Sequence, residues 1–156
     1  LSGLLHIDHR VPSLDYETLL KATLLLTKDV HECEKQFRHA VFNVLGHNRD
    51  DHAKNFSFLM EETGQWRVSP AYDLTFSSGP AGEHCTMVMG EGKYPARQHL
   101  LALADKSGIK LNRALAIIEE VRVASENWLT FASKAGVMKK SSNMIHQALS
   151  MVAKYL

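Results

Sequence analysis

The spacing of apolar residues predicts two helices in the first third of the chain. Residues 14–27 are rich in leucine and in good helix formers, and Ser13 just before them suits an N-cap. Asp29 and Glu32 have the spacing of a capping box at the start of a second helix, and Gly46 is expected to end that helix in the left-handed conformation. Apolar residues recurring at helical intervals predict its buried face: Cys33, Phe37, Val41, Val44 and Leu45.

The middle of the chain predicts a polar loop followed by a β-hairpin. Residues 47–55, hereafter the polar loop, are almost entirely polar and show no periodicity. Aromatic and β-branched runs at 56–60 and 66–69 flank a five-residue turn at 61–65, which is typical of a hairpin. A further loop at 77–82 precedes a possible strand at 85–89.

The remainder of the chain predicts three helices, over about 95–106, 111–135 and 141–155, with Gly108 and Gly136 between them. The residues expected to be buried on the last two are Leu111, Leu115, Ile118, Val121, Trp128 and Ala132, then Ile145, Leu149, Val152 and Tyr155. The fold class expected is mainly α with one small hairpin, in a single domain spanning residues 1–156.

Charge and composition exclude several functional classes. The chain has 18 basic and 17 acidic residues, a balance that favours neither nucleic acid nor a membrane surface. No apolar run approaches the roughly 18 residues of a membrane helix, so we expect a soluble, cytoplasmic domain without membrane contact. The two cysteines, Cys33 and Cys85, are expected to be buried thiols and not a disulfide.

The polar loop contains a spacing used in phosphoryl transfer. Asp50 and Asn55 are five residues apart, as in protein-kinase catalytic loops, where the aspartate accepts the hydroxyl proton and the asparagine holds magnesium. The hairpin brings a third group near them. If its turn is centred on Thr63, paired positions sum to about 126, and Asp73 lies within ~7 Å of Asn55. Oxygen ligands at that separation suit a magnesium ion.

The same residue types also gather after helices because they form turns readily. The residues alone therefore leave a turn and a catalytic loop as two open interpretations.

Two segments resemble the C-terminal domain of the HipA family of toxin kinases. Residues 42–57 contain Asn48-Arg49-Asp50-Asp51-His52-Ala53-Lys54-Asn55-Phe56-Ser57, similar to the family pattern N-x-D-x-H-x-K-N-F-S, and Pro70-Ala71-Tyr72-Asp73 is similar to P-x-Y-D. The flanks are similar too, from Arg10 to Tyr16 and around Met89 to Lys93.

The resemblance implies a helical, kinase-like C-lobe whose hairpin carries the active-site loop, with ATP and Mg²⁺ as cofactors and a protein serine or threonine as acceptor. It implies Asp50 as the catalytic base and Asn55 and Asp73 as metal and phosphate ligands. His52, Lys54 and Tyr72 would complete the nucleotide site. It further implies a toxin of a toxin–antitoxin system, held by a DNA-binding, HipB-like antitoxin through which alone it would contact DNA.

The chain departs from the eukaryotic kinase pattern. Asn48-Arg49-Asp50 replaces His-Arg-Asp, and Asp73-Leu74-Thr75 replaces Asp-Phe-Gly. No glycine-rich loop or Val-Ala-Ile-Lys strand precedes Asp50 in the sequence. We therefore expect a fragment of a longer protein that is inactive by itself.

Two other functions remain open from the sequence. His47, Asp50, Asp51 and His52 could be ligands of a metal-dependent phosphohydrolase, although the His-Asp order is reversed, and His6 with His9 could bind a metal. The chain could instead be a non-catalytic helical binding module. The basic residues of the last helices could contact DNA phosphates or simply be solvated.

Overall fold

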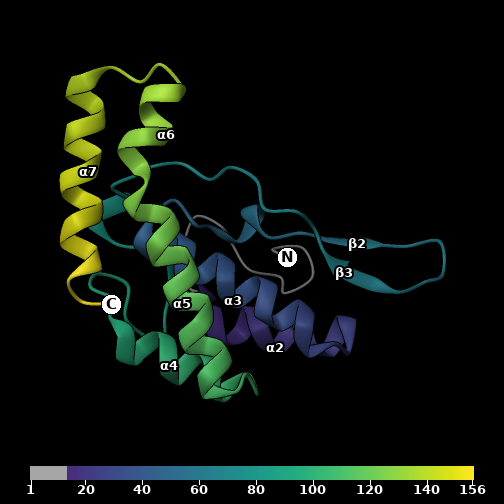
Figure 1. Ribbon diagram of the computed structural model, residues 1–156. Helices are drawn as coiled ribbons and strands as arrows, with labels where there is room; N and C mark the ends of the chain where they lie inside the picture. Colours follow the sequence, from purple (N-terminus) through teal and green to yellow (C-terminus); the bar gives the residue numbers. More distant parts are fainter. Residues whose placement is uncertain (1–13) are drawn as a thin grey trace.

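The computed structural model describes residues 14–156, in which helices predominate (Figure 1). Residues 1–13, which include Ser13 and the His6 and His9 pair, lie outside the described residues. The α-helices are α2 (Tyr16–Thr27), α3 (Val30–Leu45), α4 (Arg97–Lys106), α5 (Leu111–Glu126), α6 (Trp128–Lys134) and α7 (Lys139–Ala153). Figure 1 shows α2 and α3 side by side, with α5 crossing them and α7 beside α6.

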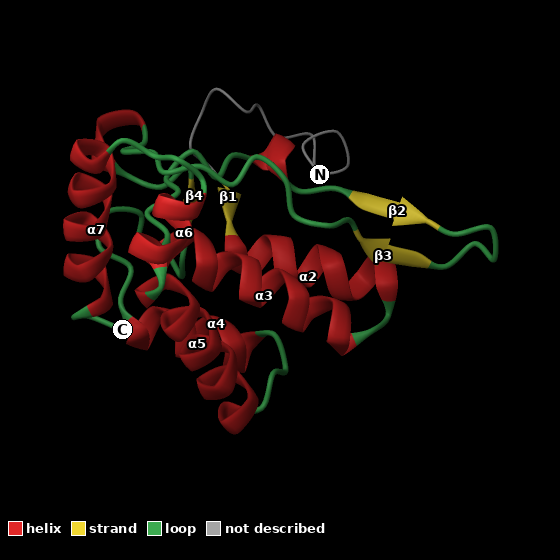
Figure 2. Ribbon diagram, turned by 45° about the horizontal axis from the view of Figure 1, so that its top comes forward, coloured by secondary structure: helices red, strands yellow, loops and turns green. Residues whose placement is uncertain are grey.

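Two short sheets accompany the polar loop: one joins segments before and after it, and the other is the hairpin that follows it. The strand β1 (Leu14–Asp15) pairs in parallel with β4 (Thr86–Met87). The hairpin strands β2 (Phe58–Met60) and β3 (Trp66–Val68) pair antiparallel, and their hairpin extends away from the helices (Figure 2). The paired positions Phe58 with Val68, and Met60 with Trp66, each sum to 126. The register predicted from the turn is therefore confirmed.

Aspartate side chains begin both N-terminal helices. Asp15 accepts a hydrogen bond from the backbone N–H of Glu17 at 2.7 Å, and Asp29 accepts one from His31 at 2.8 Å. Glu32, in contrast, does not complete the predicted capping box. It is buried and its carboxylate accepts the backbone N–H of Val68 at 2.7 Å, which ties strand β3 to α3.

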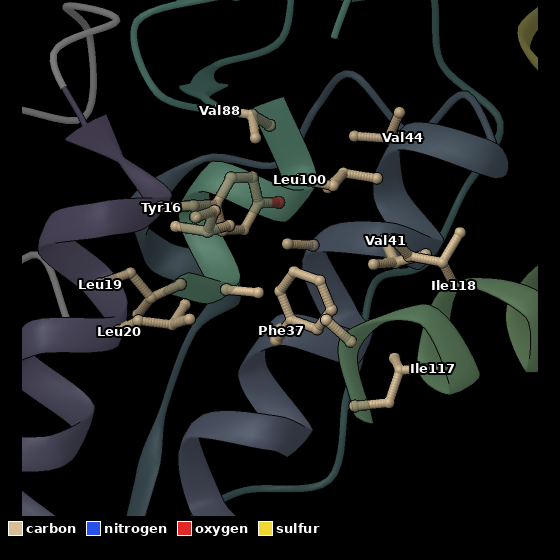
Figure 3. Close-up of a cluster of buried hydrophobic side chains, with 14 of the residues drawn as sticks. Tyr16, Leu19, Leu20, Phe37, Val41, Val44, Val88, Leu100, Ile117 and Ile118 are labelled. Atoms are coloured by element: carbon tan, nitrogen blue, oxygen red, sulfur yellow. The ribbon is translucent and has the colours of Figure 1, made fainter. Parts of the chain in front are cut away.

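The core lies where α2, α3, α4 and α5 meet. Figure 3 shows Leu19 and Leu20 of α2, Phe37 and Val41 of α3, and Ile117 and Ile118 of α5 gathered around a common centre. The predicted buried face of α3 is confirmed, since all five of its members are buried. This core supports the C-terminal end of α3, from which the polar loop departs.

Gly46 ends α3 for a reason other than the one predicted. Its φ is −76°, so it does not need the left-handed conformation, and His47 takes that conformation with φ 52°. A Cβ at Gly46 would lie 2.8 Å from the backbone oxygen of Phe42. Glycine is needed here because the chain passes too close to the last helical turn for a side chain.

The predicted helix over 111–135 is in fact two helices separated at Asn127. The Asn127 side chain donates to the Val123 carbonyl at 3.0 Å, and asparagine side chains that compete for backbone groups in this way favour helix ends. The buried positions of α5 are Ala114, Ile117, Ile118 and Val121.

Two predicted core residues in the C-terminal helices are exposed. Leu111 stands at the first turn of α5 with 61% of its surface exposed, and Tyr155 lies past the end of α7 with 69% exposed. Trp128 is half-buried and donates its indole N–H to the Ser142 carbonyl, which joins α6 to α7.

Cys33 and Cys85 are free thiols, as predicted. Among residues 14–156, none of the helices combines the length and apolar character that a membrane crossing requires.

Candidate active site

The polar loop is held from both sides by backbone hydrogen bonds. Ser77 donates its N–H to the His47 carbonyl at 3.0 Å and accepts the N–H of Arg49 at 3.2 Å. On the far side, the Cys85 N–H donates to the Arg49 carbonyl at 3.1 Å. Residues 47–49 therefore form a short, fixed ribbon that delivers Asp50 to a defined position.

Asp50 and Asp51 are neighbours with opposite environments. The Asp50 side chain is 52% exposed, and Nε2 of the His52 ring lies 4.0 Å from its carboxylate, beyond hydrogen-bond range. Asp51 is fully buried. The chain thus offers one carboxylate to solvent and uses the next one inside the fold.

The buried Asp51 carboxylate is the centre of a hydrogen-bond network. Its Oδ2 accepts the Tyr16 hydroxyl at 2.9 Å and Nδ1 of His84 at 2.9 Å, and its Oδ1 accepts the Thr86 N–H at 3.1 Å. The Thr86 hydroxyl also donates to the Asp51 carbonyl. Because buried polar groups are costly when unpaired, this set of bonds fixes the middle of the polar loop against α2 and β4.

The network continues through two buried asparagines. Asn43 donates to the Tyr16 hydroxyl at 2.8 Å, and Asn48 donates to the Asn43 side-chain oxygen at 3.0 Å. Burial raises the pKa of Tyr16 well above its usual range, and the Asp51 carboxylate acts in the same direction. Tyr16 is therefore a neutral hydrogen-bond donor and not a proton-transfer group near neutral pH.

Asn55 closes the loop on Asp50. It lies in the 3₁₀ helix Ala53–Asn55, is 6% exposed, and donates its side-chain N–H to the Asp50 carbonyl at 3.1 Å. Its amide oxygen has no hydrogen bond to any of residues 14–156. The structure thus brings two of the predicted site residues together and leaves one oxygen of Asn55 available.

Tyr72 connects the far side of the hairpin to the polar loop. Its hydroxyl donates to the Lys54 carbonyl at 2.6 Å and also lies 2.6 Å from the Ser57 hydroxyl. Two predicted residues, Lys54 and Tyr72, are therefore in contact through the tyrosine hydroxyl and the lysine backbone, while the Lys54 side chain is exposed.

Asp73 follows Tyr72 directly, just as Asn55 follows Lys54. It is exposed and has φ 55°, a left-handed conformation that is uncommon outside glycine, though less so for aspartate. No hydrogen bond or ion pair in the described part of the chain joins Asp73 to Asp50 or Asn55. The predicted approach of Asp73 to Asn55 remains a prediction.

His52 lies beside Asp50, and one nitrogen of its ring has no hydrogen-bond partner among residues 14–156. Its Nδ1 is buried and has no hydrogen-bond partner, while Nε2 faces the Asp50 carboxylate at 4.0 Å. Cys85 is the other reactive group near the loop, and burial raises the pKa of its thiol to about 11, with Asp51 and Asp50 contributing. A thiol with so high a pKa is a poor nucleophile near neutral pH.

The donor set suits magnesium better than zinc. Across residues 14–156, no three histidine, cysteine, aspartate or glutamate side chains converge as metal ligands. Magnesium instead takes one or two protein oxygens together with phosphate and water, and the Asn55 amide oxygen and the exposed Asp73 carboxylate are of that type. The phosphohydrolase interpretation loses a ligand, because both Asp51 oxygens already accept hydrogen bonds.

Sequence reasoning missed the residues that hold this site in place. Tyr16, His84 and Thr86 are 33 to 35 positions from Asp51, too far for any local pattern to connect. One signal was present. Asn43 is one of three polar residues among the buried positions of α3, with Glu32 and Gln36, and a buried polar side chain needs a partner.

Comparisons with known proteins agree with this fold. The model of the family described as the HipA-like C-terminal domain matches residues 1–129. A protein of Sinorhizobium fredii named "Putative kinase Y4mE" is 26% identical over 122 residues, covering 75% of this chain and 23% of that protein.

A solved structure has a similar fold. It contains HipA of Shewanella oneidensis in a toxin–antitoxin complex with HipB and operator DNA, and the matched chain superposes with a TM-score of 0.68 at 16% identity. The match covers 90% of this chain and 34% of that one. The chain therefore spans about a quarter to a third of the length of these relatives.

Proposed function

The chain belongs to the family of proteins with a HipA-like C-terminal domain, and on that premise we propose that it is the catalytic-loop portion of an ATP-dependent serine/threonine protein kinase. Its helices would form the kinase C-lobe, and the hairpin would carry the active-site loop. The observation that carries the proposal is the contrast at Asp50: an exposed carboxylate on a loop whose neighbours are buried and hydrogen-bonded. Such a loop presents one acceptor in a fixed position, as a general base requires.

Asp50 would orient the acceptor hydroxyl of a serine or threonine and take its proton. The hydrogen bond from Asn55 to the Asp50 carbonyl fixes the backbone that bears this carboxylate. The buried Asp51 holds the same backbone from the opposite side. The base is thus restrained by its neighbours while its own oxygens stay free for the substrate.

Asn55 and Asp73 are the residues proposed to hold magnesium, and His52, Lys54 and Tyr72 to line the nucleotide site. ATP with Mg²⁺ supplies the phosphoryl group and offsets the negative charge that develops during its transfer. Tyr72 would contribute by positioning, since its hydroxyl ties the segment before Asp73 to the backbone before Asn55.

The activity is proposed for the full-length protein. Because the matched relatives are roughly two and a half to three and a half times as long as this chain, the remaining contacts to nucleotide would come from other parts of the molecule. By the same similarity we propose that the full-length protein is the toxin of a toxin–antitoxin pair, with a HipB-like antitoxin as partner and DNA contacted within that complex.

The test is phosphorylation of a protein substrate by the full-length protein with ATP and Mg²⁺. We expect Asp50→Asn to lower the rate by about 10²–10⁴-fold, the usual contribution of a general base, without changing the fold. Asp105→Asn, the same change at an exposed aspartate of α4, is the control and should leave the rate unchanged. Full activity in Asp50→Asn would refute the assignment, and inactivity of the wild type would favour a binding module.

A further inference from the structure

A cavity of about 460 Å³ lies behind the polar loop, between the end of α3 and helix α7. Its polar lining comes from His47, Arg49, His84 and Lys93, and its opposite side is apolar. Tyr94 and Tyr155 also line it and are 70% and 69% exposed, so the cavity opens to solvent beside two aromatic rings. Helix α7 lies beyond residues 1–129, so this cavity depends on a part of the chain outside the family match.

The lining contains cations and no acid. None of its residues is an aspartate or a glutamate. Burial lowers the pKa of His47, and the positive charge of Arg49 acts in the same direction. The lining therefore carries two cations, Arg49 and Lys93, and no carboxylate of its own.

Arg49 is held in place without a counter-ion. Its guanidinium donates to the Gly82 carbonyl and, at 3.0 Å, to the Lys93 carbonyl, while its Nε is buried and has no hydrogen-bond partner. Four other arginines in the described part of the chain pair with glutamates: Arg38, Arg67, Arg113 and Arg122. A partly buried guanidinium bound only by carbonyl oxygens retains its full charge for an anion.

Lys93 adds a second cation at the same wall. Its ammonium lies 5.7 Å from the Tyr94 ring centroid and has no ion pair within residues 14–156. Glu91, two residues earlier, is not part of the lining; its carboxylate accepts the backbone N–H groups of Lys93 and Tyr94 at 2.7 and 2.9 Å and also interacts electrostatically with Lys93. These bonds shape the turn that carries Lys93.

We propose that this cavity binds a phosphorylated serine or threonine side chain within a peptide segment. Two cations match the charge of about −2 on a phosphomonoester, and the apolar wall with the two tyrosines suits the chain that bears it. The choice of a phosphoserine or phosphothreonine rests on the proposed function, of which such a segment is the product. The ligand would contact Arg49, which directly precedes Asp50, and His84, which binds the Asp51 carboxylate on the other side of Asp50.

The test is binding measured by isothermal titration calorimetry to the full-length protein carrying Asp50→Asn, which prevents turnover. The probes are a synthetic peptide with one phosphoserine between leucines, the same peptide unphosphorylated, and inorganic phosphate. We expect the phosphopeptide to bind at least tenfold more tightly than either other probe. Equal binding of the unphosphorylated peptide would overturn the proposal, as would equal binding of inorganic phosphate.

Matched lysine variants locate the site. Lys93→Gln should weaken phosphopeptide binding by about tenfold, the effect of losing one charge-assisted hydrogen bond of about 1.4 kcal/mol. Lys154→Gln, at an exposed lysine just past α7, should have no effect. Unchanged affinity in Lys93→Gln would refute the site. Because binding requires no phosphoryl transfer, phosphopeptide binding would support the site even if the kinase assay showed no activity. Kinase activity without phosphopeptide binding would refute the site and leave the proposed function standing.

Discussion

Replacing Asp51 should destabilise the fold, whereas the same replacement at the adjacent Asp50 should not. Asp51 is fully buried and accepts hydrogen bonds from Tyr16, His84 and Thr86, while Asp50 is half-exposed and accepts none in the described structure. The two residues are chemically identical and consecutive. The comparison therefore isolates the role of the buried network.

The size of the effect follows from the donors left without an acceptor. Asp51→Ala removes the acceptor of three buried donors, each costing about 1–3 kcal/mol when unpaired. A water entering the vacated space would satisfy some of them, so we expect a loss of about 3–6 kcal/mol. That is a large part of the roughly 5–15 kcal/mol that stabilises a typical domain.

Asp51→Asn should cost less, because it keeps the side-chain volume and one acceptor oxygen. The favourable amide orientation places that oxygen where Oδ2 accepts from Tyr16 and His84, which turns the amide nitrogen toward the Thr86 N–H. One donor then loses its partner, and we expect a loss of about 1–3 kcal/mol.

The assay is urea unfolding followed by far-ultraviolet circular dichroism, with Asp50→Asn as the control. Surface substitutions usually change stability by less than about 0.5 kcal/mol, and the control should fall in that range. If Asp51→Asn were as stable as the wild type, or if Asp50→Asn were equally destabilised, the assignment of Asp51 as the buried anchor of the polar loop would be wrong.

Three further substitutions test the surroundings of the site. In urea unfolding, Gly79→Ala should be more destabilising than Gly82→Ala by roughly 1–3 kcal/mol. Both glycines have positive φ, but only at Gly79 would a Cβ lie 2.1 Å from a backbone oxygen and 2.6 Å from the Arg49 side chain. Equal losses of stability in the two variants would contradict this expectation. Glu32→Ala should speed hydrogen exchange of the Val68 N–H, which it binds at 2.7 Å, whereas Glu34→Ala should not. Burial lowers the pKa of His39 in the folded protein, so the unfolded chain takes up a proton at higher pH than the folded chain does. As the pH falls below about 6.5, the free energy of unfolding should therefore decrease, by at most about 1.4 kcal/mol per pH unit for this residue. His39→Gln should reduce that slope in unfolding measured from pH 7 to 5, and an unchanged slope would count against the burial of His39.

The features that sequence reasoning predicted depend on short-range rules. The register of the hairpin follows from the centre of a five-residue turn, and the observed pairs at Phe58 and Met60 agree with it. The predicted cap Asp29 does begin α3, because helix caps are local, whereas the predicted cap Ser13 of the first helix was wrong: α2 begins at Tyr16 with Asp15 as its N-cap. The spacing of Asp50 and Asn55 is local too, and the Asn55 side chain does reach the Asp50 backbone.

The features that it missed depend on contacts between distant segments. Gly46 was expected to be left-handed from its place at a helix end. Glycine is needed there instead because a Cβ would lie too close to the Phe42 carbonyl oxygen, and that contact depends on the direction the chain takes after α3. Leu111 fits the apolar periodicity of α5, yet no element among residues 14–156 covers that first turn, and Leu111 is 61% exposed. Periodicity shows which face of a helix is apolar, and packing decides how much of it is covered.

Asp73, a proposed site residue, is one of five described non-glycine residues with a positive φ. A left-handed conformation at a residue other than glycine costs of order 1 kcal/mol, and within residues 14–156 the Asp73 side chain forms no hydrogen bond or ion pair that would offset it. The preceding residue restrains the backbone here: the Tyr72 hydroxyl binds the Lys54 carbonyl and the Ser57 hydroxyl, which fixes the chain just before Asp73. Lys28, His47, Ala81 and Met89 have a similar positive φ, so the backbone conformation of Asp73 does not by itself identify a ligand, and the proposed ligand role rests on the exposure of its carboxylate.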